Sequence, residues 1–295
     1  MSVGGEVPSV QDERPRVPLP VDRVGFTGIR VPAGRLRVGG LELTLVPEFS
    51  VFIDLPPQMR GIHASRSYQS ILKVVEDYSG REMKLEEIAA KVSKRLLEVH
   101  QYSRRSYVKV KTPAFHFSKA PISRSPSYEP FTIIARASSR RLDSRILTRV
   151  MVGVEAWGLT ACPCAKEVVE KVYGEPATHM QRSLGGLMME VGGLEVNVLE
   201  LLEVLKSSMS GPVIPHLKRL DEADLVINAF KAPKFAEDCV RDMVKLTLER
   251  WSLPDNYLIV AWIRSEESLH HQDLAAYIKI KAGEARKILR DADVG

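Results

Sequence analysis

The most constraining feature of this sequence is a switch from strand to helix periodicity that occurs twice in the same order. In the first half, alternating apolar residues predict strands, a helical period then predicts two helices, and strand patterns return. The segments are residues 41–53, 65–101, 106–119 and 129–138. This half therefore reads strand, strand, helix, helix, strand, strand.

The second half repeats this order without clear sequence similarity to the first, so the duplication is inferred only at the level of structure. Its strand patterns are 145–162, 182–193, 256–268 and 273–282, and its helical patterns are 196–209 and 233–252, with Pro233 expected in the first turn of the last helix and Pro254 just beyond its end. Such an order predicts an α+β fold of antiparallel sheets with helices on one face.

Three segments follow from this division. Residues 1–22 are rich in proline and charge and predict an extended N-terminal arm, while residues 23–140 and 141–295 form the first and second modules. Each predicted sheet has open edges, which proteins cover or pair. We therefore expect a homo-oligomer.

Composition excludes several classes of protein. The 295 residues are 44% hydrophobic and 27% charged, which is typical of a globular chain and excludes disordered and fibrous ones. No apolar run suits a membrane span or a signal peptide, so a cytoplasmic protein without a membrane partner is expected. The three cysteines form no disulfide framework, and Cys239 lies in a helical pattern where packing is its expected role.

The net charge of +5 allows either a nucleic acid or a small polyanion as partner. The densest basic group, "SRRLDSR" at residues 139–145, lacks the interleaved aromatic residues of a single-strand binding surface. We therefore expect no nucleic-acid partner, and a nucleotide remains the polyanion to consider.

The segment "ACPCAKE" carries Cys162 and Cys164 with a single proline between them. A redox pair prefers two intervening residues, and a closed zinc site needs four Cys or His ligands that the chain does not supply. One thiolate could still act as a nucleophile or as a ligand in an open metal site. The alternative is that small cysteines fill a corner between a strand and a helix.

Seven motifs in order support a resemblance to a known family. They are "VPLPVDRVGFTGIR", "FSVFIDLPPQMRGIHASR", "ACPCAKE", "THMQRS", "LKRLDE", "PKFAEDCVRD" and "EESLHH". Together they resemble the second, non-classical family of GTP cyclohydrolases, most closely its archaeal branch in methanopterin-type biosynthesis, over residues 10–282. Two departures are Leu220, where the family has proline, and the run His270, His271 and Gln272, where it often has HxH.

The resemblance implies a tunnelling fold with two modules per subunit, assembled as a homodimer or homotetramer into a barrel, with most of the metal site in the second module. It implies a site thiol and metal ligand at Cys162, further metal ligands at His179 and Glu222, a guanine anchor at Glu237, and groups near the reacting base at Glu267 and His270. His271 is left outside the set of metal ligands.

The implied reaction converts GTP to formate and a dihydroneopterin phosphate with one divalent metal per subunit. Fe²⁺ is favoured, with Zn²⁺ and Mn²⁺ as alternatives. His270 would be the acid and Glu267 its orienting partner, and the cationic candidates for the triphosphate are Arg66, Arg182, Lys218 and Arg219, together with His63.

Two product branches stay open: the 2',3'-cyclic phosphate with diphosphate, or dihydroneopterin triphosphate. Rival interpretations are a related nitrile reductase with a cysteine nucleophile and NADPH, and a non-catalytic nucleotide- or RNA-binding module on the same fold.

Overall fold

The computed structural model describes residues 9–38, 41–78, 84–143 and 145–293. The chain divides into two compact units: unit 1 comprises residues 1–112 and 135–150, and unit 2 comprises residues 113–134 and 151–295. Strands β5 (Arg105–Lys119), β6 (Pro126–Leu142) and β7 (Arg145–Ala161) contribute to both units. These compact units are a different division of the chain from the sequence modules 23–140 and 141–295, which stay a prediction.

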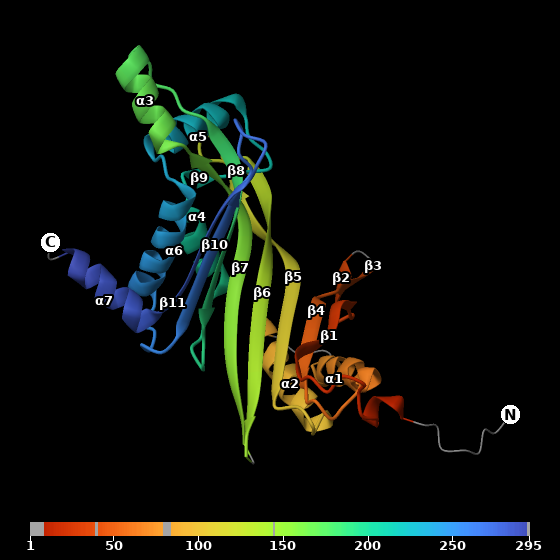
Figure 1. Cartoon of the computed structure of the whole chain (residues 1–295). Coiled ribbons are helices and arrows are strands. Elements are labelled where there is room, and N and C mark those ends of the chain that lie inside the picture. The colour runs from red at the N-terminus through yellow and green to blue at the C-terminus, as the bar shows by residue number, and fades with distance from the viewer. Residues whose placement is uncertain (1–8, 39–40, 79–83, 144, 294–295) are drawn as a thin grey trace. The chain divides into compact units, whose positions relative to one another are not determined.

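Unit 1 is an antiparallel sheet with two helices (Figure 1). Strand β4 (Glu48–Leu55) pairs with β1 (Val21–Arg30) and with β5, and a separate hairpin joins β2 (Gly34–Val38) to β3 (Leu41–Leu45). Alternate residues of β4, Phe49, Val51 and Ile53, are buried against helices α1 (Ala64–Asp77) and α2 (Leu85–Val99). The predicted strands on either side of Pro47 and both predicted helices are confirmed.

Unit 2 has the strand order β7-β8-β10-β11, in which every neighbouring pair is antiparallel. Strands β8 (Met180–Glu190), β10 (Leu258–Ser265) and β11 (Leu274–Lys281) match predicted strands. Helices α4 (Val198–Ser207) and α6 (Ala236–Arg250) pack on this sheet, α4 against β8 and α6 against β10 and β11 (Figure 1). The predicted α+β class is confirmed.

Several elements differ from the sequence prediction. The sequence did not predict helices α5 (Arg219–Lys231) and α7 (Ala282–Asp293). In α5, Leu220, Val226 and Ile227 are exposed, so its apolar residues do not form a buried face. Helix α6 begins after its N-cap Phe235, which leaves Pro233 outside the first turn. The arm contains a short 3-10 helix, η1 (Val10–Asp12), and β9 (Gly211–Pro212) pairs with β7. None of the described helices is long and apolar enough to cross a membrane.

A buried histidine joins the end of α2 to α1 in unit 1. His100 has no exposed surface, its Nε2 lies 3.0 Å from Ser67 Oγ, and its Nδ1 lies 2.8 Å from the Tyr102 hydroxyl. Burial lowers the pKa of His100 to about 4, and the nearby Arg66 and His63 act in the same direction. The folded chain therefore holds this imidazole in its neutral form.

We predict that acid weakens unit 1 through His100. The pKa of His100 in the folded chain lies below its ordinary value of 6.5, so the unfolded chain binds more protons at pH values between the two and stability falls as pH falls through that window. Between about pH 7.5 and about pH 5 the loss attributable to His100 should be about 1–2 kcal/mol. Denaturant unfolding of the wild type and His100→Gln at both pH values measures it, and equal losses in the two proteins would contradict the prediction.

Candidate active site

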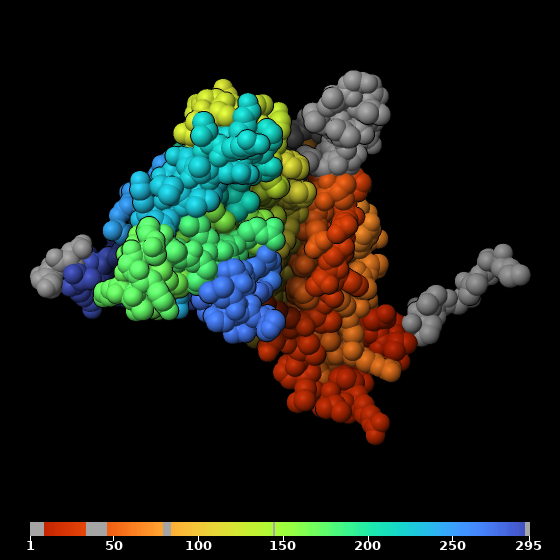
Figure 2. Space-filling view, turned by 90° about the horizontal axis from the view of Figure 1, so that it is seen from above, coloured from red at the N-terminus to blue at the C-terminus, as the bar shows by residue number. Residues whose placement is uncertain are grey.

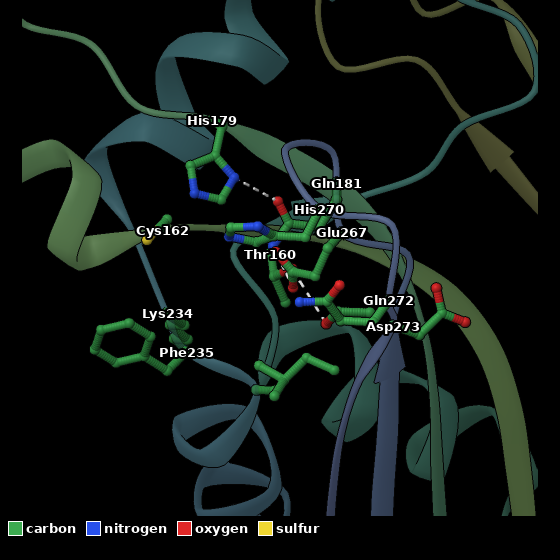
Figure 3. Close-up of a pocket in the computed structure, with 13 residues that line it drawn as sticks. Thr160, Cys162, His179, Gln181, Lys234, Phe235, Glu267, His270, Gln272 and Asp273 are labelled. Carbon is green, nitrogen blue, oxygen red and sulfur yellow. Dashed lines mark hydrogen bonds between the residues drawn. The ribbon is translucent and has the colours of Figure 1, made fainter.

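A pocket of about 260 Å³ lies in unit 2 where β7 and β10 end and β8 and β11 begin (Figure 3). Figure 2 shows helix α3 (Pro163–Tyr173, green) beside the loop between β10 and β11 (blue), the two segments that flank this end of the sheet. The pocket is lined by Thr160, Cys162, His179, Gln181, Lys234, Phe235, Ala236, Ser265, Glu267, His270, Gln272, Asp273 and Leu274. Four of the residues selected from the sequence, Cys162, His179, Glu267 and His270, are thus brought together.

Cys162 is the N-cap of α3, directly after the last residue of β7. Pro163 suits the first helical position, and the thiol Sγ of Cys162 accepts the N–H of Ala165 at 3.4 Å. This is where a helix concentrates partial positive charge, which favours an anionic cap. The half-buried thiol is therefore held at a helix N-terminus that faces the pocket.

His179 lies beside Cys162 because the chain returns after α3. Gly174 ends the helix with φ 72°, a left-handed conformation that suits glycine. The N–H of Cys162 then donates to the carbonyl oxygen of His179 at 3.1 Å, and the Thr178 hydroxyl donates to the carbonyl of Cys162 at 2.6 Å. Cys162 and His179 are therefore neighbours, joined by a main-chain hydrogen bond.

Gln181 connects His179 to Glu267. Gln181 Nε2 donates to Glu267 Oε1 at 3.2 Å, so Gln181 Oε1 faces His179 Nδ1, 3.1 Å away (Figure 3). An amide oxygen only accepts, so Nδ1 of His179 carries a hydrogen in this arrangement and Nε2 is the nitrogen that remains for a metal. Such an arrangement is the usual one for a histidine that binds a metal through Nε2. Gln181 was not selected from the sequence, although it lies within "THMQRS".

The loop between β10 and β11 supplies Glu267, His270 and Gln272 to the pocket (Figure 3). Its first residue, Glu266, donates its N–H to the carbonyl of Arg182 at 2.9 Å, and an ion pair of 2.8 Å joins Arg264 to Asp273 across its base. His271 does not line the pocket, whereas Gln272 does.

The start of α6 closes another side of the pocket. Lys234 forms an ion pair with Asp242 at 2.7 Å and donates to the carbonyl oxygens of Ser207 and Ser208, so its charge is used to hold the fold. Glu237, the predicted guanine anchor, is exposed on the first turn of α6 and follows the lining residue Ala236, but does not itself line the pocket.

The two carboxylates of "KRLDE" have different surroundings. Asp221 is fully buried, and its side chain accepts the N–H groups of Ile122, Ser123 and Lys218 at 2.8–2.9 Å. Burial raises the pKa of Asp221, but the hydrogen bonds from these groups outweigh it and hold the pKa far below its ordinary value. Glu222 is exposed and does not line the pocket.

The remaining predicted residues lie outside the pocket. Arg182 pairs with Glu266 at 3.0 Å and lies over the Trp157 ring, where it lines a second cavity of about 220 Å³ in unit 2. Lys218 and Arg219 are exposed at the start of α5. His63 and Arg66 belong to unit 1, where His63 Nε2 lies 3.0 Å from Asp12 Oδ1. Their contacts with substrate stay predictions.

The donors fit a metal in part. Thiolate and imidazole are the ligands that zinc and ferrous iron accept, and Cys162 and His179 present both to one pocket. Within the described ranges, however, no group of three or more His, Cys, Asp or Glu side chains is arranged to hold a metal ion. The third predicted ligand, Glu222, therefore stays a prediction.

The other two cysteines have contrasting positions. Cys164 is exposed on the first turn of α3, so it does not fill a corner between the strand and the helix. Cys239 is fully buried in α6, and burial raises its pKa to about 12. Its expected role in packing is confirmed.

Comparisons with known proteins agree on one family. A family model described as type I GTP cyclohydrolase folE2 matches residues 7–276. The chain is 34% identical to GTP cyclohydrolase MptA of Methanosphaera stadtmanae over 96% of this chain and 97% of that protein. It is 35% identical to GTP cyclohydrolase MptA of Methanococcus vannielii over 94% of this chain and 97% of that protein.

Solved structures support the fold alone. A uricase from Arthrobacter globiformis matches with a TM-score of 0.53 and 10% identity, covering 88% of this chain and 93% of that one. A hyperthermostable mutant of Bacillus sp. TB-90 urate oxidase matches with a TM-score of 0.52 and 9% identity, covering 88% of this chain and 99% of that one. These likenesses confirm the predicted tunnelling fold.

We predict that substitutions of the neighbouring carboxylates Asp221 and Glu222 have different effects, one on thermal stability and the other on metal content. Asp221→Asn should lower the melting temperature, because an amide is a weaker acceptor for three backbone N–H groups than a carboxylate. Glu222→Gln should leave the melting temperature unchanged and lower the metal content of protein reconstituted with Fe²⁺.

Differential scanning calorimetry and elemental analysis of the two variants provide these readouts. An equal loss of thermal stability in both would show that Glu222 is structural, and full metal content in Glu222→Gln would remove it from the ligand set.

Proposed function

Because this chain belongs to the type I GTP cyclohydrolase family, we propose that it hydrolyses GTP to formate and a dihydroneopterin phosphate. One observation carries the proposal: Cys162 and His179, which come from two separate family motifs, line one pocket together with Glu267 and His270. Cyclohydrolase chemistry needs a nucleophilic water, a proton donor and a hold on the purine, and each of these has a candidate in or beside this pocket.

We propose that the enzyme uses one divalent metal per subunit, with Fe²⁺ favoured over Zn²⁺ or Mn²⁺. Cys162 and His179 would be ligands, and Glu222 is the third candidate. When bound by these residues, a metal of this kind would lower the pKa of a water from about 15.7 to about 7, and so would make a nucleophile available at neutral pH for the carbon between the two imidazole nitrogens of guanine.

The protein groups would hold and move protons around that carbon. Gln181 fixes His179 with its hydrogen on Nδ1, and Glu267 in turn fixes the direction of the Gln181 amide. His270 would donate a proton to the ring nitrogen as its bond to the carbon breaks. In this arrangement Glu267 orients His179 through Gln181, which extends the role first expected for it beside His270.

Binding of the rest of GTP would draw on neighbouring surfaces. Glu237 would accept the ring N–H and the exocyclic amine of guanine, as a carboxylate can with two parallel hydrogen bonds. Arg66, Arg182, Lys218 and Arg219, together with His63, are the candidates for the phosphates. We favour the 2',3'-cyclic phosphate with release of diphosphate, as in methanopterin-type biosynthesis, and mass spectrometry of the product distinguishes it from the triphosphate.

We also propose a cytoplasmic homo-oligomer. Cys162, Cys164 and Cys239 are free thiols, as a reducing compartment keeps them. Strand β11 pairs only with β10 among the described strands, and an edge of this kind is available for pairing with another copy of the chain. Light scattering of the purified protein tests the assembly, and a monomer at working concentration would contradict it.

Removal of the Cys162 thiol should abolish turnover and spare the fold. We predict that Cys162→Ala lowers the rate of formate release from GTP by more than about 100-fold, because even loss of a residue that only hydrogen-bonds to a metal ligand costs about 10–100-fold. The melting temperature should change little, since the thiol is only half-buried. Cys164→Ala is the matched control, with an unchanged rate expected for an exposed cysteine. Near-normal turnover by Cys162→Ala would overturn the assignment.

Loss of the Glu237 charge should weaken GTP binding without loss of metal. For Glu237→Gln we expect KM for GTP to rise about 10–100-fold, the worth of one charge-assisted hydrogen bond to guanine. Glu249→Gln, at the exposed far end of the same helix, is the control. Steady-state kinetics with metal analysis decides the point, and an unchanged KM would remove Glu237 as the anchor.

A further inference from the structure

Unit 1 contains a cavity that the proposed reaction does not use. Its volume is about 910 Å³, within the range of small-molecule sites. It lies where β1 begins, β4 ends, β5 begins and β6 ends. The lining residues with charge are Asp22, Asp54, Arg104, Arg105, Arg140, Arg141 and Asp143.

The arginines come from a short sequence that occurs twice. "SRR" stands at residues 103–105 and again at 139–141, and both copies reach this cavity. The backbone aligns them, because the N–H of Arg141 donates to the carbonyl of Arg104 at 2.8 Å. Four arginines, from the start of β5 and the end of β6, therefore line one cavity.

Two of the charged side chains, those of Arg141 and Asp54, form hydrogen bonds with the backbone of unit 1. The Arg141 guanidinium donates to the carbonyl oxygens of Leu97 and Ser103. Asp54 Oδ1 accepts the backbone N–H groups of Arg104 and Arg105 at 2.8 and 2.7 Å. Asp54 thus fixes the backbone that carries these arginines, and it does not pair with their guanidinium groups.

Three guanidinium groups are left for a ligand. Among the described residues, the side chains of Arg104, Arg105 and Arg140 are exposed and form no ion pair. Elsewhere in unit 1, by contrast, Arg30 pairs with Glu48 at 3.3 Å and Arg60 pairs with Glu13 at 2.6 Å. Unpaired positive charge is thus gathered at the wall of the cavity.

The arrangement fits phosphate. A guanidinium presents a planar fork of N–H donors that matches two oxygens of a phosphate group, and several forks around one cavity suit a chain of phosphates. The exposed carboxylates Asp22 and Asp143 also line the cavity, and they accept hydrogen bonds from hydroxyl or amino groups such as those of a nucleoside.

We propose that this cavity binds a polyphosphate chain, either free or as part of a nucleoside triphosphate, in a site separate from the pocket around Cys162. Binding there depends on Arg104, Arg105 and Arg140 and needs neither a metal nor turnover. The proposal goes beyond the cyclohydrolase reaction, and it stands or falls independently of it.

Isothermal titration calorimetry of the full-length, metal-free protein with sodium tripolyphosphate tests the proposal. We expect the wild type to bind, Arg105→Gln and Arg140→Gln each to bind about tenfold more weakly, and Cys162→Ala to bind like the wild type. Lys94→Gln, an exposed charge on α2 that does not line the cavity, is the matched control and should bind like the wild type. Melting temperatures confirm that the variants are folded.

A parallel titration with GTP distinguishes the two sources of phosphate. Equal affinities for GTP and tripolyphosphate, both weakened in the arginine variants, support a site for free polyphosphate. Tighter binding of GTP, weakened in the same variants, supports a nucleotide site. Absence of tripolyphosphate binding to the wild type, or binding that Arg105→Gln and Arg140→Gln leave unchanged, overturns the proposal, as does binding of an RNA oligonucleotide without binding of tripolyphosphate.

Discussion

The candidate site depends on one backbone hydrogen bond, from the N–H of Cys162 to the carbonyl oxygen of His179. Strands β7 and β8 pair up to Ala161 and Met180, and this bond continues the pairing by one step beyond the ladder. Helix α3 therefore lies in a segment between β7 and β8 whose two ends, Cys162 and His179, are hydrogen-bonded to each other. A thiol and an imidazole that are far apart in sequence become neighbours because the sheet itself brings them together, and not because a loop happens to fold over.

The same end of the sheet organises the rest of unit 2. The loop after β10 is joined to β8 through the bond from Glu266 to Arg182, and the start of α6 is joined to β7 through the bond from Lys234 to Ala161. Each segment that reaches the pocket is thus attached to a strand end by main-chain hydrogen bonding. Side chains on such attachments keep their positions better than side chains on long loops, as catalysis requires.

The periodicity of apolar residues predicted most of the fold, but it missed helices that bury few apolar side chains. The strands and the helices α1, α2, α4 and α6 have clear apolar patterns. In α5, by contrast, Leu220 and Val226 are exposed, so its sequence shows no apolar face that would predict a helix. At the site, the resemblance to the cyclohydrolase family selected Cys162, His179, Glu267 and His270. It could not find Gln181, whose importance lies in a hydrogen bond across strands, nor show that Asp221 is buried while Glu222 is exposed.

The amide of Gln181 determines what can pass between Glu267 and His179. An amide neither gains nor loses a proton near neutral pH, so the connection from Glu267 to His179 passes on orientation but no proton. Reversal of the amide would set its oxygen against Oε1 of Glu267 and would lose the hydrogen bond from Nε2, so this bond favours one direction of the amide. Gln181 therefore transmits the position of Glu267 to the His179 ring through two hydrogen bonds, without itself accepting or releasing a proton.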